Sequence, residues 1–328
     1  MLPRNDEKGD NMDYINDQEI RRLISMSDII ETIEAYYLQD GEERSLLPER
    51  LFINDGKNSA LLMPSFYENY YGAKLIGIAP GNVVIGEATL RGVFLLSDRK
   101  TMKPLVLMDA RTITAMRTGA VSGLGMKYLA SDETDTIGVI GTGDQGFSHL
   151  QAACAVRPIQ RALVYNRSKG RLDSFLEKAK GEFPSIQFEV AEPETILKEA
   201  QLIITTTTSV EPVIPYDGQI DLTGKHFAAS GSFKSFMQEI PDAIINEADY
   251  LFVDSHAAFT ECGEMIKAKT FGYNEDMVPE LKSLVQCGNN ENMKNKTTIF
   301  KSVGVSIFDI LTAKFIYERY DKKNMKKE

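Results

Sequence analysis

The spacing of hydrophobic and polar residues changes along the chain and predicts elements of different kinds. Residues 17–40 carry apolar side chains at helical spacing, which predicts two helices, with Ser27 and Asp28 placed to cap the second. After Pro48, short runs rich in β-branched and aromatic residues are separated by Gly, Asn and Asp, as in a mainly antiparallel sheet. Residues 112–129 return to helical spacing, and their small residues would permit close packing.

The middle of the chain alternates predicted strands with predicted helices. Such alternation is typical of βαβ units, in which a parallel sheet is covered by helices on both faces. The last periodic run, residues 297–320, is interpreted as one long amphipathic helix after a turn at Gly304; it cannot extend the sheet, so we expect it to cross back onto the first domain. The predicted fold class is therefore α/β, with a Rossmann-type doubly wound parallel sheet at 131–301 and a second, α+β domain formed by 1–130 and 302–328. The predicted strands are TIGVIG, RALVYN, QFEVA, AQLIITTTT, KHFAASGS and YLFVDS.

Composition and charge exclude several classes of protein. The 328 residues, 43% of them hydrophobic and 26% charged, are enough for about two globular domains. With 37 basic and 47 acidic residues the net charge is −10, which argues against non-specific nucleic-acid binding. The amino-terminal segment is charged and polar, and no run of 18 apolar residues occurs, so we expect neither a signal peptide nor a membrane span and a cytoplasmic location.

The cysteines and histidines give no sign of a disulfide framework or a metal site. The three cysteines are far apart in the sequence, and reduced thiols are their expected state. The three histidines lack the spacing of zinc ligands, and no cluster of Cys, His and carboxylates has metal-ligand form. We therefore expect no bound metal.

A glycine-rich turn follows the first predicted strand of the alternating region. The strand at 136–140 leads directly into GTGDQG, and helical sequence follows. In a GxGxxG turn the first glycine permits the tight turn, the second lets the backbone approach a pyrophosphate, and the third lets helix and strand pack closely. This context favours a dinucleotide site over an ordinary structural turn. The candidate cofactor contacts in it are Gly141, Gly143, Asp144, Gln145 and Gly146.

Residues at the end of the second strand of this domain are expected to select the cofactor. An acidic residue there would accept hydrogen bonds from the ribose hydroxyls of NAD, but this strand ends in Asn166, Arg167 and Ser168. A guanidinium with neutral donors beside it suits a 2′-phosphate, so NADP(H) is favoured over NAD(H). The alternative is that Arg167 belongs to a solvated helix start. Thr206 and Thr207, at the end of a later strand, would line the crevice, although strand propensity alone also explains a run of threonines.

Three basic residues are candidates for holding a substrate carboxylate. Arg117 lies in a helical run just ahead of the dinucleotide domain, and Arg50 and Lys74 lie on or beside predicted strands of the first domain. A lysine inside an apolar strand is costly unless its charge is used or paired. Each of the three could instead be a surface charge or part of an ion pair.

Several blocks of sequence together resemble one known family over nearly the whole chain. They are the P-x-R segment with Arg50, the strand lysine Lys74, LVLMDARTITAMRTGAVS, GTGDQG, GSFKSFMQEI and KTTIFKSVGVSIFDILTAKFIY. These blocks resemble the ornithine cyclodeaminase and mu-crystallin family, and the last of them, with YNRS, is most similar to the mu-crystallin or ketimine reductase branch.

The resemblance implies roles for individual residues. It implies that Arg50, Lys74 and Arg117 bind the substrate carboxylate and that Lys74 also lies near the reacting nitrogen. Thr118 would help to hold the pyrophosphate, and the Ser302–Gly304 turn would return close to the nicotinamide. The first domain would then be a substrate-binding and dimerisation domain, and the antiparallel sheet would make the protein a homodimer.

One position departs from the family's cyclodeaminase members, which carry an aspartate in the loop before the glutamate of GSFKSFMQEI. Counting back six places from Glu239 gives Phe233, flanked by Ser232 and Lys234, and no acid stands there. Because phenylalanine cannot accept a proton, the conversion of ornithine to proline and ammonia loses its expected base.

The resemblance and this departure together favour an NAD(P)H-dependent oxidoreductase that acts on a C=N or CH–NH bond next to a carboxylate. It would be a reductase of cyclic ketimines or pyrroline-2-carboxylate, or an amino-acid or opine-type dehydrogenase. The alternatives are an NAD-dependent ornithine cyclodeaminase and a binding protein that holds NADPH and a small ligand without turnover. In the favoured mechanism, the cations Arg50 and Arg117 make Lys74 a better proton donor to the imine nitrogen, or a water held by Lys74 donates instead. Met63, Phe66, Tyr67 and Phe233 are candidates for shaping the pocket.

Overall fold

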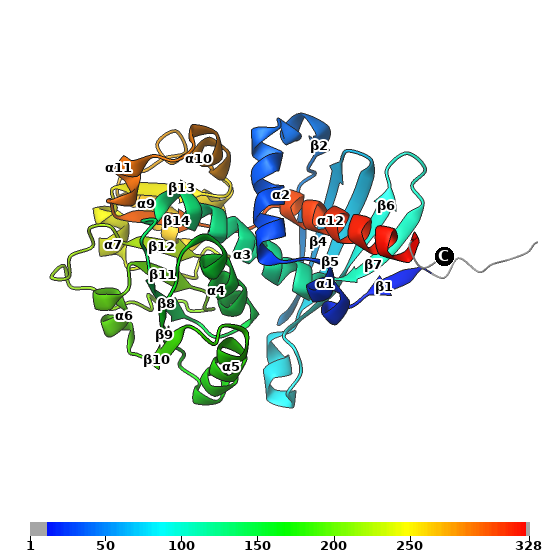
Figure 1. The fold of residues 1–328 in the computed structure, drawn as a ribbon. Coiled ribbons are helices and arrows are strands. Elements are labelled where there is room, and N and C mark those ends of the chain that lie inside the picture. The colour runs from blue at the N-terminus through cyan, green and yellow to red at the C-terminus, as the bar shows by residue number, and fades with distance from the viewer. Residues whose placement is uncertain (1–11, 326–328) are drawn as a thin grey trace, which may run out of the picture. The chain divides into compact units, whose positions relative to one another are not determined.

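The computed structural model describes residues 12–325, which form two compact units (Figure 1). The first unit comprises the described residues up to Ser25, together with Glu42–Thr114 and the chain from Ser306 onward. The second comprises Met26–Gly41 and Ala115–Val305. Helix α3 (Ala110–Leu129) begins in the first unit and continues in the second. The domain boundaries drawn from the sequence at residues 130 and 301 stay a prediction.

The first unit contains a seven-stranded sheet in the order β1-β7-β6-β5-β4-β2, with β3 also paired to β4. All of its pairs are antiparallel except β1 with β7, so the predicted mainly antiparallel sheet is confirmed. Residues alternate between more and less buried along β5 and along the second half of β4, as a sheet with one covered face requires. The strands are β1 (Asp13–Ile15), β2 (Ser45–Leu46), β3 (Leu51–Asp55), β4 (Asn58–Tyr67), β5 (Tyr70–Ile78), β6 (Leu90–Asp98) and β7 (Pro104–Asp109).

Besides the start of α3, the described part of the first unit contains two helices and two short 3₁₀ turns. Helix α1 (Asp17–Leu23) is capped by Asn16, whose side chain accepts a hydrogen bond from the backbone N–H of Glu19 at 3.0 Å. Helix α12 (Ser306–Met325) packs against β4, β5 and β6 and so covers one face of the sheet. The 3₁₀ turns are η1 (Gly41–Arg44), whose first residue belongs to the second unit, and η2 (Pro80–Ile85).

The second unit is built on a seven-stranded parallel sheet in the order β10-β9-β8-β11-β12-β14-β13, which confirms the Rossmann-type prediction. One prediction was wrong: residues 298–301, which were grouped with the carboxy-terminal helix, form strand β14 inside this sheet. All four are buried, so the strand shows no alternation by which a sequence pattern would reveal it. The strands are β8 (Thr136–Ile140), β9 (Arg161–Tyr165), β10 (Gln187–Val190), β11 (Leu202–Thr205), β12 (His226–Ala229), β13 (Tyr250–Val253) and β14 (Thr298–Lys301).

Helices cover both faces of this parallel sheet. Successive residues of β11 enter different hydrophobic clusters, Ile203 on one face and Leu202 and Ile204 on the other. Helix α2 begins at Met26, so Ser27 and Asp28 lie in its first turn and not at the cap position predicted for them. The helices are α2 (Met26–Leu38), α4 (Asp144–Val156), α5 (Lys169–Glu182), α6 (Pro193–Glu199), α7 (Asp242–Glu247), α8 (Ala258–Glu261), α9 (Gly263–Thr270), α10 (Leu281–Cys287) and α11 (Glu291–Lys294).

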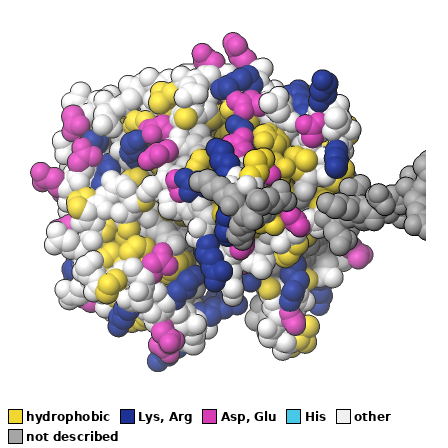
Figure 2. Space-filling view, turned by 45° about the vertical axis from the view of Figure 1, so that its right-hand side comes forward, with side chains coloured by type: hydrophobic (Ala, Val, Ile, Leu, Met, Phe, Trp, Pro, Cys, Tyr) yellow, Lys and Arg dark blue, Asp and Glu magenta, His cyan; other side chains and the backbone are white. Residues whose placement is uncertain are grey.

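Two structural observations concern the expectations about nucleic-acid binding and membrane spans. Acidic side chains are spread over the face of the molecule shown in Figure 2 and do not gather in one patch. Within residues 12–325, no helix has both the length and the apolar composition needed to span a membrane.

Candidate active site

The glycine turn between β8 and α4 has the geometry expected of a dinucleotide cradle. Gly141 has a φ of +108°, and a Cβ there would lie 2.8 Å from the carbonyl oxygen of Thr206. A Cβ at Gly146 would overlap the carbonyl oxygen of Gly141, whereas one at Gly143 would meet nothing within 4 Å. Gly143 is also the N-cap of α4 and supplies no side-chain acceptor to its first N–H groups. The turn therefore has open space and backbone donors at the point where a pyrophosphate would bind.

The predicted cofactor-selecting residues lie at the carboxyl end of β9. Asn166 links two loops, because its Oδ1 accepts from the backbone N–H of Thr142 at 3.4 Å and its Nδ2 donates to the carbonyl oxygen of Ser168 at 3.0 Å. Arg167 and Ser168 are exposed, and helix α5 begins just after them without a side-chain capping bond. Within the described chain, the guanidinium of Arg167 has no hydrogen-bond or ion-pair partner. These side chains are therefore accessible to a ligand.

The threonines that end β11 are held by the groups around them. Thr206 donates from Oγ1 to the carbonyl oxygen of Gly141 at 3.1 Å, so it belongs to the glycine turn. Thr207 donates from Oγ1 to Glu239 at 2.8 Å and also donates its backbone N–H to that carboxylate. The two predicted threonines are thus held in place just after the carboxyl end of β11.

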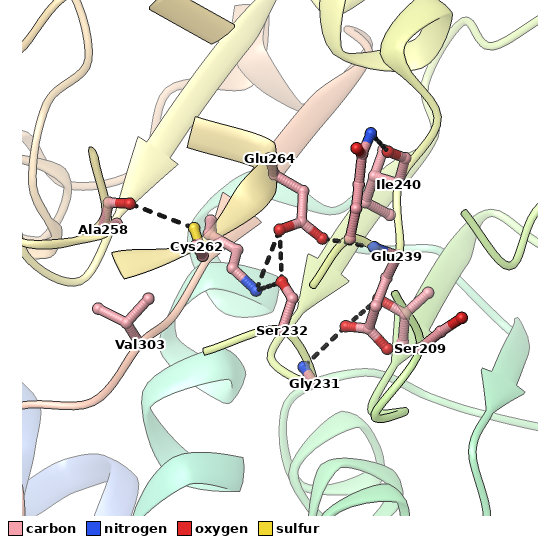
Figure 3. Close-up of polar contacts among 12 residues, drawn as sticks. Ser209, Gly231, Ser232, Glu239, Ile240, Ala258, Cys262, Glu264 and Val303 are labelled. Atoms are coloured by element: carbon pink, nitrogen blue, oxygen red, sulfur yellow. Dashed lines mark hydrogen bonds and ion pairs between the residues drawn. The ribbon is translucent and has the colours of Figure 1, made fainter. Parts of the chain in front are cut away.

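Glu239 is a fully buried carboxylate that connects the ends of β11 and β12 (Figure 3). Besides the two bonds from Thr207, it accepts from the backbone N–H of Gly231 at 2.7 Å and from Oγ1 of Thr205 at 3.1 Å. A Cβ at Gly231 would overlap the backbone of Thr207, so glycine is required there. Burial raises the pKa of Glu239, while its hydrogen-bond donors favour the ionised form.

Lys301, at the end of β14, extends this buried network through Ser232 and Glu264, which Figure 3 labels. Its Nζ donates to Oγ of Ser232 at 2.6 Å, and Ser232 donates in turn to the carboxylate of Glu264. The other oxygen of Glu264 accepts from the backbone N–H of Glu239 at 2.7 Å. Burial disfavours the charge of Lys301, but the neighbouring acids, Glu264 foremost, raise its pKa. The network holds the carboxyl ends of three strands together.

The Ser302–Gly304 turn and Arg117 come together in the second unit. Asp254 accepts hydrogen bonds from Oγ of Ser302 and from the backbone N–H of Gly304, both at 2.7 Å. A Cβ at Gly304 would lie 2.7 Å from Nη1 of Arg117, on helix α3. Arg117 and its neighbour Thr118 are both buried.

His149 was missed by the sequence analysis, although it contacts a predicted cofactor residue. Its Nδ1 lies 2.7 Å from the carbonyl oxygen of Gln145, which can only accept, so Nδ1 carries the proton. Its Nε2 therefore accepts, with Oγ of Ser122 at 2.9 Å and Oγ of Ser230 at 3.0 Å. Burial lowers the pKa of His149 to about 4, so the ring is neutral.

In the first unit, Lys74 is buried on β5 and forms an ion pair with Asp309 of α12, at 2.8 Å between Nζ and Oδ2. Lys74 stands in register between Met63 on β4 and Phe94 on β6, so the three side chains share the face that α12 covers. Asp309 was missed, although an acid among the apolar residues of SIFDIL was a signal for it. Arg50 is half-buried just before β3.

The remaining pocket candidates lie on different faces. Tyr67 is buried on the same face of the sheet as Lys74. Phe66 points to the opposite face, where its ring stacks on Tyr71 with centroids 4.7 Å apart. Within residues 12–325, no three His, Cys, Asp or Glu side chains are arranged to hold a metal ion.

Comparison with known proteins identifies the family. Residues 12–324 match the model of the ornithine cyclodeaminase/mu-crystallin family. The chain belongs to this family. It is 35% identical over 316 residues to a Δ¹-pyrroline-2-carboxylate reductase of Bacillus cereus, covering 93% of this chain and 95% of that protein.

Solved structures of family members superpose on nearly the whole chain. The Δ¹-pyrroline-2-carboxylate reductase of Thermococcus litoralis, in complex with NADH and L-proline, matches with a TM-score of 0.86 and 31% identity over 95% of this chain and 98% of that chain. An archaeal alanine dehydrogenase dimer with bound NAD matches with a TM-score of 0.85 and 25% identity over 95% and 97%.

In this member of the ornithine cyclodeaminase/mu-crystallin family, Phe233 occupies the loop that follows β12. Its side chain is 40% exposed, and the ammonium of Lys234 lies 5.9 Å from its ring centroid. The same ammonium lies 5.9 Å from the ring of Phe236. The loop therefore presents two aromatic rings and a cation, and none of these groups can act as a general base in the manner of a carboxylate.

Proposed function

We propose that this chain is a nicotinamide-nucleotide-dependent reductase of a C=N bond adjacent to a carboxylate, with Δ¹-pyrroline-2-carboxylate or a related cyclic ketimine as substrate. The observation that carries the proposal is the buried Lys74–Asp309 pair, in a chain whose glycine turn is open at Gly143. The names of its relatives from Bacillus cereus and Thermococcus litoralis support the substrate class. Asp144 and Gln145, in the first turn of α4, and Thr118 are proposed to contact the pyrophosphate.

In the proposed reaction, the protein orients the substrate and the cofactor and supplies one proton. When bound, the reduced nicotinamide supplies a hydride. Arg50 and Arg117 are proposed to bind the substrate carboxylate, because guanidinium groups match its geometry. An imine accepts hydride well only when its nitrogen is protonated, so a proton donor is needed.

Lys74 is the proposed donor to the imine nitrogen, directly or through a water that it holds. The carboxylate of Asp309, 2.8 Å from Nζ, is the counter-ion of this ammonium. Asp309 also restricts the direction in which the ammonium can point, because both side chains are buried between β5 and α12. A donor held in this way contributes by its orientation.

We propose NADP(H) as the preferred cofactor. The end of β9 carries Arg167 and Ser168 where an NAD-selecting carboxylate would stand. Both are exposed, and α5 begins there without a side-chain cap, so its first N–H groups add to the attraction for a phosphate. Asn166 orients this loop through its bond to Thr142.

We propose a homodimer formed through the face of the first unit's sheet that is opposite to Lys74. Leu51, Leu62, Leu75 and Val93 form one row across four strands of that face, and Leu51 and Leu75 are 54% and 48% exposed. Among residues 12–325, strand β3 pairs with β4 alone, so its other edge is available for pairing. An apolar sheet face of this kind is typical of a subunit interface, and the alanine dehydrogenase relative is described as a dimer.

The test is an assay of the purified protein for oxidation of NADPH and NADH at 340 nm with cyclic imines and with pyruvate plus several amines. A reductase consumes the reduced nucleotide with at least one carboxylated imine. A cyclodeaminase would instead release ammonia and proline from ornithine without a net absorbance change. Saturable NADPH binding with no turnover across the panel would contradict the proposal and favour a binding protein.

A further inference from the structure

The turn that follows β14 is held by a single buried carboxylate. Asp254, just after β13, is 4% exposed. It accepts from Oγ of Ser302 at 2.7 Å, from the backbone N–H of Val303 at 3.0 Å and from the backbone N–H of Gly304 at 2.7 Å. Three consecutive residues thus donate to one anion. Hydrogen bonds to a charged acceptor are stronger than neutral ones, so this turn has little freedom to move.

The same turn is also anchored at its start. The backbone N–H of Ser302 donates to the carbonyl oxygen of Ala229 on β12 at 3.0 Å. The preceding residue, Lys301, is fully buried and reaches Ser232, which is bonded to Glu264 (Figure 3). A chain segment with buried charges on both sides cannot shift without breaking a charged hydrogen bond.

The turn ends against the guanidinium of Arg117. Gly304 has a φ of +86°, and its Cα faces Arg117 so closely that a Cβ would lie 2.7 Å from Nη1, 3.0 Å from Nη2 and 3.2 Å from Cζ. Arg117 is itself only 5% exposed. The backbone at Gly304 therefore limits the positions that the guanidinium can take.

We propose that Asp254 is a positioning residue: through the Ser302–Gly304 turn it sets the guanidinium of Arg117 for binding the substrate carboxylate. This inference rests on the proposed function of Arg117. It assigns no contact between Asp254 and the substrate. Misalignment of a bidentate donor by about 1 Å weakens recognition strongly, so a loosened turn should reduce the selectivity for a carboxylate more than it reduces cofactor binding.

Three substitutions disturb this arrangement in different ways, and a fourth serves as a matched control. Asp254→Asn removes the charge and one acceptor oxygen, whereas Gly304→Ala places a methyl group against Arg117 and strains the backbone. Gly288 has a φ of +70°, but a Cβ there would meet nothing within 4 Å. Gly288→Ala therefore introduces backbone strain without the contact. Ser302→Ala removes one donor of the three and should have a smaller effect than Asp254→Asn.

The carboxylate probe is pyrrole-2-carboxylate, a planar compound that has no C=N bond to be reduced. Its binding to each variant is measured by calorimetry, and NADPH affinity is measured by fluorescence titration. We expect Asp254→Asn and Gly304→Ala to bind this carboxylate about 10- to 100-fold more weakly than the wild type. In Asp254→Asn, NADPH affinity should fall by a smaller factor than carboxylate affinity, and Gly288→Ala should bind both ligands like the wild type. The preference for Δ¹-pyrroline-2-carboxylate over Δ¹-pyrroline in kcat/KM should fall by a similar factor in the first two variants.

The proposed function and the positioning role of Asp254 can fail separately. If the wild type oxidises no NADPH with any carboxylated imine, the proposed function fails, whereas the calorimetric comparison still tests the role of Asp254. Unchanged carboxylate binding in Asp254→Asn and Gly304→Ala, or equal weakening in Gly288→Ala, would overturn the inference. So would parallel losses of carboxylate and NADPH affinity in Asp254→Asn, because they would indicate a merely structural role.

Discussion

Breaking the Lys74–Asp309 pair should destabilise the protein strongly, and removing both partners should not. The two charges lie 2.8 Å apart, and their side chains are 1% and 0% exposed, so each would remain buried without its counter-ion if the other were removed. The expected loss is about 3–5 kcal/mol of unfolding free energy for Lys74→Met or Asp309→Leu alone. The double variant replaces the pair by apolar groups and should lie within about 2 kcal/mol of the wild type, or above it.

The assay is urea denaturation followed by circular dichroism for the wild type, both single variants and the double variant. At about 2–4 °C per kcal/mol, the single variants should also lose roughly 6–20 °C in Tm. Lys198→Met is the control, because it breaks an exposed pair with Glu194 and should cost less than about 1 kcal/mol. A loss below about 1 kcal/mol in the single variants would refute the reasoning, and so would a double variant as unstable as the sum of the two. Every variant that lacks Lys74 should lose turnover while it retains NADPH binding.

Three other expectations concern the cofactor, the pH dependence of stability and the assembly. Arg167→Ser should weaken NADPH binding about 10- to 100-fold and NADH binding little. The control Lys180→Ser, at the other end of α5, should change the binding of neither nucleotide. Equal effects of Arg167→Ser on both nucleotides in a fluorescence titration would argue against a 2′-phosphate contact. Burial lowers the pKa of His149 to about 4 and that of His226 to about 3, from a usual value of 6.5. Below pH 6.5 the unfolded chain takes up a proton at each of these rings, whereas the folded chain does not. The free energy of unfolding is therefore highest, as far as these two rings are concerned, above pH 6.5, and it declines as the pH falls toward 4. The decline is about 2 kcal/mol for each ring at pH 5, and urea midpoints that do not change between pH 7 and 5 would contradict it. Leu75→Lys should convert the dimer to a monomer in light scattering, and a dimer of unchanged stability would place the interface elsewhere.

Local patterns were enough to predict much of the fold. Three features depend on residues that are neighbours in sequence, so the sequence pattern could predict them: the glycine turn, the alternation of strands and helices after it, and the antiparallel strands before it. Strand β14 could not, because four consecutive buried residues next to a long helical run have no periodicity of their own. Its place between β12 and β13 depends on pairing with strands distant in sequence.

The candidate site, like the fold, has features that the sequence predicted and features that only the structure revealed. The sequence by itself indicated that a lysine in an apolar strand is costly unless its charge is used or paired, and it supplied the residue types for a dinucleotide turn. Only the tertiary structure identified Asp309 as that partner, 235 residues away, and brought Gly304 against Arg117. The physical reason is that residue types and local spacing set which charges must be compensated, whereas burial and hydrogen-bond geometry between distant segments decide which groups compensate them.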